Sequence, residues 1–413
     1  MREMKDSGIE WAGVIPNTWN INKGKYFMEL LTRPTLETDE VITCFRDGEV
    51  TLRSKRREEG FTVSLTEAGY QGIEIGDLVV HGMDGFAGSI GISDSRGKAT
   101  PVLSVLDTEQ NKRYMMYLMR TMAYCELFLS LATGIRVRTC DTNWKKLREI
   151  DYILPTIPEQ KAIADFLDEQ CAEIDSLISD IQSQIEALEE YKRSVITEAV
   201  TKGLDPDVEM RDSGVQWIGM MPTHWDCQRG KYLLRYVQKP VRDDDGVITC
   251  FRDGEVTLRS NRREEGFTMA DKEIGYQGID VGDLVVHGMD GFAGSIGISD
   301  SRGKASPVLN VLDTEQNKRY IMYYLRSMAY NDVFVALATG IRVRSCDLRW
   351  NKLAELLYPM PPVEEQQAIV EHIDSVLERT NAIIADKKQQ IETIEEYKKS
   401  LIFEYVTGKK EVA

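Results

Sequence analysis

Two long stretches of the chain carry apolar residues at helical spacing. The first runs from Glu159 to Val200 without Gly or Pro, and Pro155 and Pro158 precede it while Gly203 follows it. Proline suits a first helical turn and glycine commonly follows a last one, so this stretch predicts one uninterrupted helix.

The apolar residues of this helix repeat every seven positions. The repeating residues are Ile174, Ile181, Leu188 and Val195, and three places after two of them stand Leu177 and Tyr191. This spacing is typical of a coiled-coil seam, which one helix cannot bury alone. The second stretch, 365–407, is the expected partner. Packed antiparallel, two helices of about 40 residues would form a spacer roughly 60 Å long.

The predicted seam is imperfect. Polar residues stand where apolar ones are expected, at Gln184, Thr380, Lys387 and Gln390. An antiparallel pairing would set the weaker first half of the second helix against the more apolar C-terminal half of the first.

The whole pattern occurs twice. The segment CFRDGEVTLRS begins at Cys44 and again at Cys250, an offset of 206 residues. The same offset relates VVHGMDGFAGSIGISDSRGKA at Val79 and Val285, and LATGIRVR at Leu131 and Leu337. A period this long indicates a tandem duplication of a domain with its helix, and the two copies are expected to be related by an approximate two-fold axis.

Within each repeat the pattern changes along the chain. An arm with Trp and Pro but no clear period is predicted to be irregular. Short β-type segments follow (EVTL, GDLVVHGM and GSIGIS in the first repeat), separated by glycine turns. The next segment, 111–132, is apolar all round and predicts a buried helix.

The predicted fold class is therefore α+β: two repeated α/β domains separated by two long helices packed as an antiparallel coiled coil, with pseudo-two-fold symmetry. The expected parts are a first domain with its arm at 1–155, the first long helix at 156–203, a second domain with its arm at 204–359, and the second long helix with a tail at 360–413.

Composition narrows the class of protein. The hydrophobic fraction of 42% suits a globular chain, and no apolar run is long enough to cross a membrane. The N-terminus lacks the apolar core of a signal peptide, so a cytoplasmic protein is expected. The seven cysteines form no CxxC pair and are expected to be reduced, mostly buried thiols.

The net charge of −16 argues against nucleic-acid binding until its distribution is considered. Residues 159–200 carry a net charge of −8 and residues 365–407 a net charge of −4, which leaves −4 for all other residues. Most of the acid therefore lies in the two long helices.

No catalytic or cofactor motif is present. HGMDGFAGSIG lacks the GK[ST] ending of a P-loop and the spacing of a dinucleotide site, and no HExxH or S-adenosylmethionine motif occurs. His81 and His287 are predicted to be structural, and Asp84 and Asp290 to cap a turn in preference to reading a base. No cofactor or metal is expected, and the chain is predicted to be a binder and not an enzyme.

Three basic clusters in each repeat, beside turns, are the candidate DNA contacts. Arginine can hold a guanine edge with two hydrogen bonds, and both Lys and Arg neutralise phosphates; the alternative is a solvated face paired with nearby acids. In the first repeat the candidates are Arg46, Arg53, Lys55, Arg56, Arg57, Arg96, Lys98, Arg136 and Arg138. In the second they are Arg252, Arg259, Asn261, Arg262, Arg263, Arg302, Lys304, Arg342 and Arg344.

Similar sequences introduce the two long helices, LPTIPEQKAIADFLD from Leu154 and MPPVEEQQAIVEHID from Met360. The two arms are also similar, with MKDSGIEWAGVIPNTW and MRDSGVQWIGMMPTHW. These four sequences carry a family resemblance. With two domains each followed by a long helix, the whole chain resembles the specificity subunit of type I restriction-modification systems. The resemblance implies two target-recognition domains that each read half of a split double-stranded DNA site. It also implies two methyltransferase subunits docked on the chain, an endonuclease subunit that can join them, and no catalysis by the chain itself.

The near identity of the two domains departs from the usual family pattern. Protein two-fold symmetry is mirrored by palindromic DNA, so we expect an interrupted inverted repeat as the target. Three differences near the basic clusters limit this expectation: Lys55 against Asn261, Thr142-Asn143 against Leu348-Arg349, and Ser104 against Asn310.

Two other functions remain open from the sequence. One is a DNA endonuclease with an unrecognised active site, and the other is a structural coiled-coil scaffold that carries two protein-binding modules.

Overall fold

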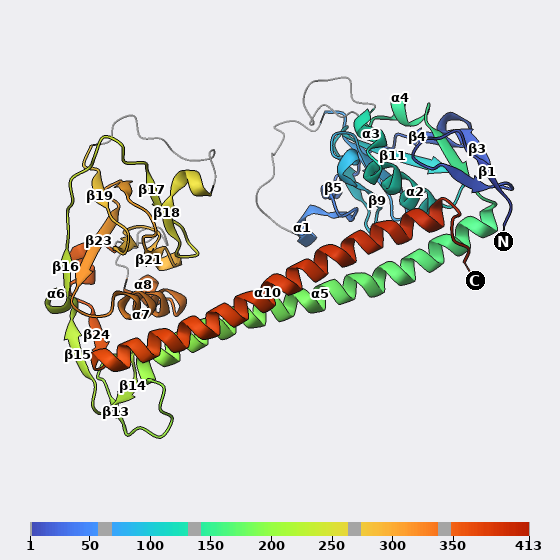
Figure 1. Cartoon of the computed structure of the whole chain (residues 1–413). Helices are drawn as coiled ribbons and strands as arrows, with labels where there is room; N and C mark the ends of the chain where they lie inside the picture. Colours follow the sequence, from blue (N-terminus) through green and yellow to red (C-terminus); the bar gives the residue numbers. More distant parts are fainter. Residues whose placement is uncertain (1, 57–67, 131–141, 263–273, 338–347, 413) are drawn as a thin grey trace. The chain divides into compact units, whose positions relative to one another are not determined.

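The computed structural model describes residues 2–56, 68–130, 142–262, 274–337 and 348–412 (Figure 1). The chain divides into two compact units. Unit 1 comprises Met1–Ile181 with Lys388–Ala413, and unit 2 comprises Gln182–Lys387. Each unit therefore combines one set of strands and short helices with a part of each long helix.

In unit 1 the strands are β1 Met4–Asp6, β2 Val14–Pro16, β3 Asn20–Lys23, β4 Met28–Leu31, β5 Ile42–Cys44, β6 Val50–Leu52, β7 Gln71–Ile73, β8 Leu78–His81, β9 Ile90–Ile92, β10 Gly97–Ala99, β11 Leu103–Thr108 and β12 Asp151–Leu154. The helices and short helical turns that begin there are η1 Gly24–Tyr26, α1 Arg53–Arg56, η2 Gly85–Ala87, α2 Lys112–Tyr124, α3 Leu127–Ser130, α4 Trp144–Leu147 and the long α5 Ile157–Lys202.

In unit 2 the strands are β13 Met210–Asp212, β14 Met220–Pro222, β15 Asp226–Arg229, β16 Leu234–Tyr236, β17 Ile248–Cys250, β18 Val256–Leu258, β19 Gln277–Ile279, β20 Leu284–His287, β21 Ile296–Ile298, β22 Gly303–Ala305, β23 Leu309–Thr314 and β24 Leu357–Met360. The helices and helical turns are α6 Gly230–Leu233, η4 Arg259–Asn261, η5 Gly291–Ala293, α7 Lys318–Tyr330, α8 Val333–Ala336, α9 Trp350–Leu353 and the long α10 Val363–Val406. The predicted mixture of helices and strands is confirmed.

A four-stranded antiparallel sheet forms the centre of unit 1, in the order β4-β11-β8-β9. On β11, one of the two inner strands, Val105 lies opposite Leu31 of β4 and Val79 of β8. Successive strand residues point to opposite faces. Val79 and Val105 accordingly join a core with β5, β6, β7 and β10, whereas Leu106 joins a second core with α2 and the long helices. The sheet β16-β23-β20-β21 repeats this arrangement in unit 2.

A buried glutamine ties the start of each long helix to the short helix of its unit. The Gln160 side chain, which is 0% exposed, donates to Pro155 O at 2.9 Å and to Gln110 Oε1 at 2.7 Å, and it accepts from Asn111 N at 2.9 Å. Asn111 in turn caps α2 by accepting from the backbone N–H groups of its first turn. Gln366 makes the equivalent three bonds in unit 2.

A buried tyrosine makes a second connection, to the end of the other long helix. In unit 1 the Tyr114 hydroxyl lies 3.0 Å from Ile153 O and 3.2 Å from Val406 O, at the last turn of α10. In unit 2 the Tyr320 hydroxyl is placed in the same way, 3.1 Å from Val200 O near the end of α5. The segment predicted as a buried helix therefore carries the connection between the sheet and the long helices.

The long helices lie within the predicted segments 156–203 and 360–413 and run antiparallel inside each unit. In unit 1 the Phe166 and Tyr405 rings lie 4.5 Å apart and Asp175 pairs with Lys398 at 2.6 Å, so the numbering rises along α5 as it falls along α10. In unit 2 the side chain of Lys387 donates to Gln184.

The structure agrees with one of the two predicted rows of the seam, which contains Ile174 and Ile181. The other predicted row, which contains Leu177 and Tyr191, is wrong. Ile174 and Ile181 are buried, but Leu177 is 48% exposed and Tyr191 is 51% exposed. The second row consists instead of residues four places after the first, such as Ile178 and Ile185, which are half-buried. Both spacings fit a heptad, and packing selects the one that places the isoleucines toward the partner helix.

The arms also differ from the prediction of irregular structure. In unit 1, β1 and β2 pair as an antiparallel hairpin with Lys5 opposite Ile15, and in unit 2 β13 pairs with β14 in the same way. From this hairpin the Lys5 side chain donates to the backbone oxygen of Trp19 at 2.6 Å, and Trp19 is a core residue that is 0% exposed.

Two chemical features complete the description. Among the described residues the cysteines are free thiols, and burial raises the pKa of both Cys44 and Cys250 to about 12. No helix in the described part of the chain has the length and apolar character needed to span a membrane.

Candidate nucleic-acid interface

A tight turn after β8 organises the polar surface of unit 1. We call residues His81–Asp84 and their equivalents His287–Asp290 the HGMD turns. In the first turn, His81 Nδ1 accepts from Met83 N at 3.3 Å and from Asp84 N at 3.0 Å. Gly82 N donates to Val102 O at 2.7 Å. These bonds fix the turn from two sides.

The turn histidine must be neutral to hold this geometry, because a protonated imidazole has no acceptor nitrogen. Burial lowers the pKa of His81, opposed by Asp84 and assisted by Arg46, and the same causes lower the pKa of His287. The structural role predicted for both histidines therefore agrees with their contacts.

Candidate arginines of the first basic cluster lie beside the HGMD turn. Arg46 donates to Asp84 Oδ1 at 2.9 Å, and this pair is solvent-accessible, with side chains 65% and 34% exposed. Arg56 pairs with Asp47 and Glu49 and lies over the Phe45 ring at 4.2 Å. Unit 2 repeats both arrangements with Arg252 on Asp290 at 3.2 Å and with Arg262 on Asp253, Glu255 and Phe251.

The remaining described members of this cluster differ between the repeats. Lys55 contacts Ser95 at 2.7 Å and Asp94 at 3.3 Å, whereas its counterpart Asn261 donates to Thr257 at 2.8 Å. Arg53 and Arg259 each donate to a threonine of the adjacent strand at 3.3 Å. Arg57 and Arg263 lie outside the described residues.

The second basic cluster is held within the fold. Arg96 donates to both carboxylate oxygens of Asp39, at 3.0 and 3.1 Å, and also binds Glu74; the Asp39 side chain is 2% exposed. The guanidinium lowers the pKa of Asp39 through these hydrogen bonds. Arg302 binds Asp245 and Asp280 in the same way. Lys98 and Lys304 belong to the neighbouring strands β10 and β22.

The third basic cluster, with Arg136, Arg138, Arg342 and Arg344, lies outside the described residues. The first described residue after it, Thr142, donates its N–H to Gly82 O at 2.8 Å, and Leu348 donates to Gly288 O at 2.8 Å. In both units the described chain therefore resumes at the HGMD turn after the residues that carry this cluster. Arg46 and Arg252 of the first cluster also lie at this turn, whereas Arg96 and Arg302 belong to a separate network.

Two of the differences between the repeats are buried. In unit 1 the Thr142 hydroxyl lies 2.9 Å from His81 O and 3.0 Å from Gly82 O. In unit 2 Leu348 has no such donor, and Asn310 supplies one instead, donating to Val286 O and Leu348 O at 3.1 Å each. Thr142, Ser104, Leu348 and Asn310 are all between 2% and 8% exposed. Each unit thus has one buried side-chain donor near the HGMD turn, although the donors bind different carbonyls. Because the four side chains are buried, these exchanges lie inside the fold.

An arginine that the sequence analysis did not select lies beside the same surface. Arg120 of α2 donates to Asp47 O at 2.7 Å and to the Tyr124 hydroxyl at 3.0 Å, and Arg326 of α7 donates to Asp253 O at 3.2 Å and Ile296 O at 2.8 Å. The available signal was a cation that stands among apolar residues, away from the Lys-Arg pair that begins each helix.

An open groove separates this surface from the long helices in each unit. In unit 1 the groove has a volume of about 570 Å³ and is lined by residues that include Arg46, Arg120, Asp175 and Lys398. The groove of unit 2 measures about 540 Å³ and includes the equivalent Arg252, Arg326, Asn381 and Lys192. Cations and carboxylates alternate along both, so neither groove is a simple phosphate site.

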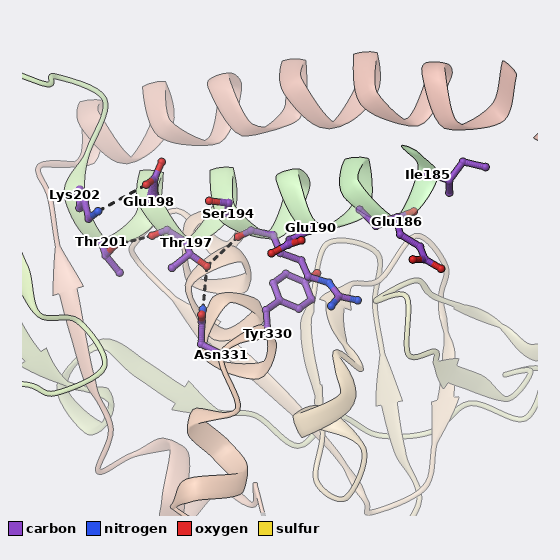
Figure 2. Close-up of a pocket in the computed structure, with 12 residues that line it drawn as sticks. Ile185, Glu186, Glu190, Ser194, Thr197, Glu198, Thr201, Lys202, Tyr330 and Asn331 are labelled. Carbon is purple, nitrogen blue, oxygen red and sulfur yellow. Dashed lines mark hydrogen bonds and ion pairs between the residues drawn. The ribbon is translucent and has the colours of Figure 1, made fainter. Parts of the chain in front are cut away.

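The C-terminal half of α5 borders a larger hollow of about 750 Å³, drawn in Figure 2. There Asn331 donates to Thr197 Oγ1 at 3.0 Å, and Lys202 lies beside Glu198. Its carboxylates, which include Glu186, Glu189 and Glu190, outnumber its cations. This acidic surface is unsuited to DNA phosphates.

In the parts of the chain that the structure describes, no group of three or more His, Cys, Asp and Glu side chains is placed to hold a metal ion. The candidate surface offers hydrogen-bonding and charged groups instead.

The fold and the repeated HGMD turns define a two-repeat α+β protein with an equivalent polar surface in each repeat. No family model matches the chain. Two curated relatives from Methanocaldococcus jannaschii do match it. One, described as the type I restriction enzyme MjaX specificity subunit, is 24% identical over 72% of this chain and 67% of its own. The other, the type I restriction enzyme MjaVIII specificity subunit, is 26% identical over 74% of this chain and 73% of its own.

A solved structure shares the fold. One chain from a study of complex assembly and conformational transition of the type I R-M system matches with a TM-score of 0.68 at 11% identity, over 96% of this chain and 99% of that chain. Together the relatives and the fold indicate a type I restriction-modification specificity subunit, and they confirm the resemblance seen in the sequence.

The HGMD histidines generate the first prediction. Replacing His81 by Leu should destabilise the protein by about 1 kcal/mol, because the backbone N–H groups of Met83 and of the part-buried Asp84 lose their acceptor. His81→Asn keeps a side-chain oxygen near the Nδ1 position and should retain most of the stability. The measurement is the free energy of unfolding of the full chain by denaturant, and equal losses in the two variants would contradict the acceptor role.

The lowered histidine pKa also sets a pH dependence. The unfolded state takes up the proton first, so stability is complete above the unfolded value of about 6.5 and falls as the pH drops through the lower folded value. A chain with Asn at both positions 81 and 287 should lose this part of the pH dependence.

The buried exchange generates the second prediction. Thr142→Leu alone should cost about 1 kcal/mol because a buried donor is lost. Adding Ser104→Asn should recover part of that loss, with a coupling energy of about 0.5–3 kcal/mol in a double-mutant cycle. The DNA sequence selected should not change in either variant, and a changed selection would show that one of these positions reads a base.

Proposed function

We propose that each repeated domain reads one half of a bipartite double-stranded DNA site. The observation that carries this proposal is the convergence at the HGMD turn. In each unit an exposed arginine–aspartate pair, Arg46–Asp84 or Arg252–Asp290, lies at one rigid turn. The first described residue after the third basic cluster, Thr142 or Leu348, is bonded to the same turn.

The candidate cations would contribute unequally to this interface. An exposed ion pair such as Arg46–Asp84 contributes about 0–1 kcal/mol, so Arg46 can exchange its carboxylate for a phosphate or a guanine at little cost. Arg96 would have to abandon a buried carboxylate, which is far more costly. We therefore assign DNA contacts to Arg46, Arg56 and their equivalents first, and a structural role to Arg96 and Arg302.

We further propose that the long helices act as the spacer between the two domains and as the docking surface for two methyltransferase subunits. Asp175 and Lys398 line the groove on the side of the domain. Residues two positions apart on a helix point about 200° apart. Leu177 is two positions from the groove residue Asp175, and Tyr397 is two positions from the groove residue Glu395, so both face away from the groove. They are 48% and 55% exposed.

Unit 2 has the equivalent exposed residues. Tyr191 and Ile383 are 51% and 48% exposed, and each is two positions from a groove residue. An aromatic and an aliphatic side chain on the outer side of a helix pair are suited to receive helices from a partner. Each unit would then receive one methyltransferase subunit.

In this proposal the chain itself carries out no catalysis. The methyltransferase partners supply the methyl donor and its chemistry, and an endonuclease subunit can complete the assembly. The chain contributes the choice of sequence and the distance between half-sites.

The equivalence of the two domains makes the target an interrupted inverted repeat. The exchange of Thr142 and Ser104 for Leu348 and Asn310 supports this proposal, because all four side chains are buried. Lys55 against Asn261 remains an exposed difference and the candidate for a preference confined to one half-site.

The third prediction concerns this target. Selection of binding sites from a random duplex library by the full chain co-expressed with its methyltransferase subunit should return the same half-site on opposite strands around a fixed gap. Lys55→Asn should make the two half-sites more alike without changing the gap. Two unrelated half-sites would overturn the equivalence of the domains.

The fourth prediction concerns docking. Leu177→Glu should weaken binding of one methyltransferase subunit at least tenfold, because the new charge must be buried at the interface. Tyr191→Glu should do the same for the other subunit. Native mass spectrometry of the co-purified complex would report the loss of one methyltransferase subunit for each variant.

Ser176→Glu is the matched control for the docking variants. It adds the same charge at an exposed polar position beside Leu177 and should leave the complex intact. A complete complex with Leu177→Glu, or equal loss with Ser176→Glu, would contradict the assignment of this face.

A further inference from the structure

The HGMD turns each expose one apolar side chain amid charged groups. Met83 is 55% exposed and Met289 is 57% exposed. The same turns carry the exposed ion pairs Arg46–Asp84 and Arg252–Asp290. An apolar residue at this place is not required by the turn, which needs only the backbone N–H of residue 83.

The backbone beneath Met83 is strongly constrained. The preceding residues are held by His81 N to Ser89 O at 3.0 Å, Gly82 N to Val102 O at 2.7 Å and Thr142 N to Gly82 O at 2.8 Å. The Met289 turn has the same bonds, including Met289 N to His287 Nδ1 at 3.2 Å. A side chain presented by a fixed backbone loses less conformational freedom when it binds than one on a loose loop.

Methionine is suited to an apolar contact with a base. Its side chain is unbranched and polarizable and adapts to an irregular apolar surface. The 5-methyl group of thymine is the apolar feature that double-stranded DNA displays in its major groove, and apolar side chains recognise it there.

We propose that Met83 and Met289 are specificity-determining residues, each in apolar contact with a thymine methyl group in its own half-site. This inference rests on the proposed function, since it requires that each domain binds a half-site. The neighbouring Arg46 and Arg252 would bind a phosphate or a guanine. Each methionine would favour a thymine at the position that it contacts.

Exposure alone does not single out these residues, because isolated exposed apolar residues are common on proteins. Ile75 and Val281 are more exposed, at 70% and 66%, but they lie on a different turn of each domain. They therefore provide a matched control for the loss of an exposed apolar side chain.

The experiment uses the full chain co-expressed with its methyltransferase subunit and the DNA site that the wild-type complex selects. Met83→Ala and Met289→Ala should each weaken binding to that site about tenfold and leave binding to unrelated duplex and its salt dependence unchanged, because no charge is removed. Met83→Leu should retain most of the affinity, and Ile75→Ala should bind like the wild type.

A scan of thymine to deoxyuridine then identifies the contact. Removing one methyl group in a half-site should weaken binding by the wild type, and the same change should have no further effect on the variant that lacks the methionine of that half. Unchanged affinity of Met83→Ala and Met289→Ala, or indifference of the wild type to every thymine methyl, would overturn the inference. A wild-type complex that selects no sequence would instead refute the proposed function.

Discussion

Buried hydrogen bonds between the sheet and short helix of each unit and the ends of the long helices are the constraint on which the rest of the unit depends. Gln160 and Tyr114 meet carbonyl groups at the start of α5 and the end of α10, and Gln366 and Tyr320 repeat this in unit 2. Carbonyls of a last helical turn lack intrahelical partners, and Pro155 O and Pro361 O lie just ahead of a first turn. Leaving such a buried polar group unpaired costs about 1–3 kcal/mol. The short helices α2 and α7 are therefore fixed to the long helices, and the sheets that pack on them follow.

The same reasoning explains why the candidate interface is centred on the HGMD turn and not on basic residues alone. Most of the candidate cations in the described part of the chain have carboxylate partners, and they differ in the free-energy cost of giving up those partners. Arg46 shares an exposed pair, whereas Arg96 holds a carboxylate that is 2% exposed. A basic residue in the sequence is thus a candidate contact only when its partner is itself accessible to water, because exposed ion pairs are weak.

The near identity of the two domains has a physical consequence beyond their common origin. Where they differ internally, at Thr142 and Ser104 against Leu348 and Asn310, one hydrogen-bond donor replaces another at the same corner of the fold. The polar surface above that corner keeps its arrangement. The helices differ more, with a net charge of −8 in one and −4 in the other, so variation has accumulated away from the surface proposed to read DNA.

The sequence alone determined the duplication, the two long helices and the buried helix α2, because these features are periodic and periodicity survives without coordinates. It did not show that the segment predicted as one helix at 111–132 breaks after Tyr124 and begins again as α3 Leu127–Ser130. It also indicated the family, through the phrases whose Gln160 and Gln366 prove to be buried. Only the tertiary structure decided which row of the heptad faces the partner helix, that Leu177 and Tyr191 are exposed, and which arginines are held by buried carboxylates. These properties depend on neighbours far away along the chain, such as Asp39 for Arg96, and no local pattern encodes the distance between two such residues.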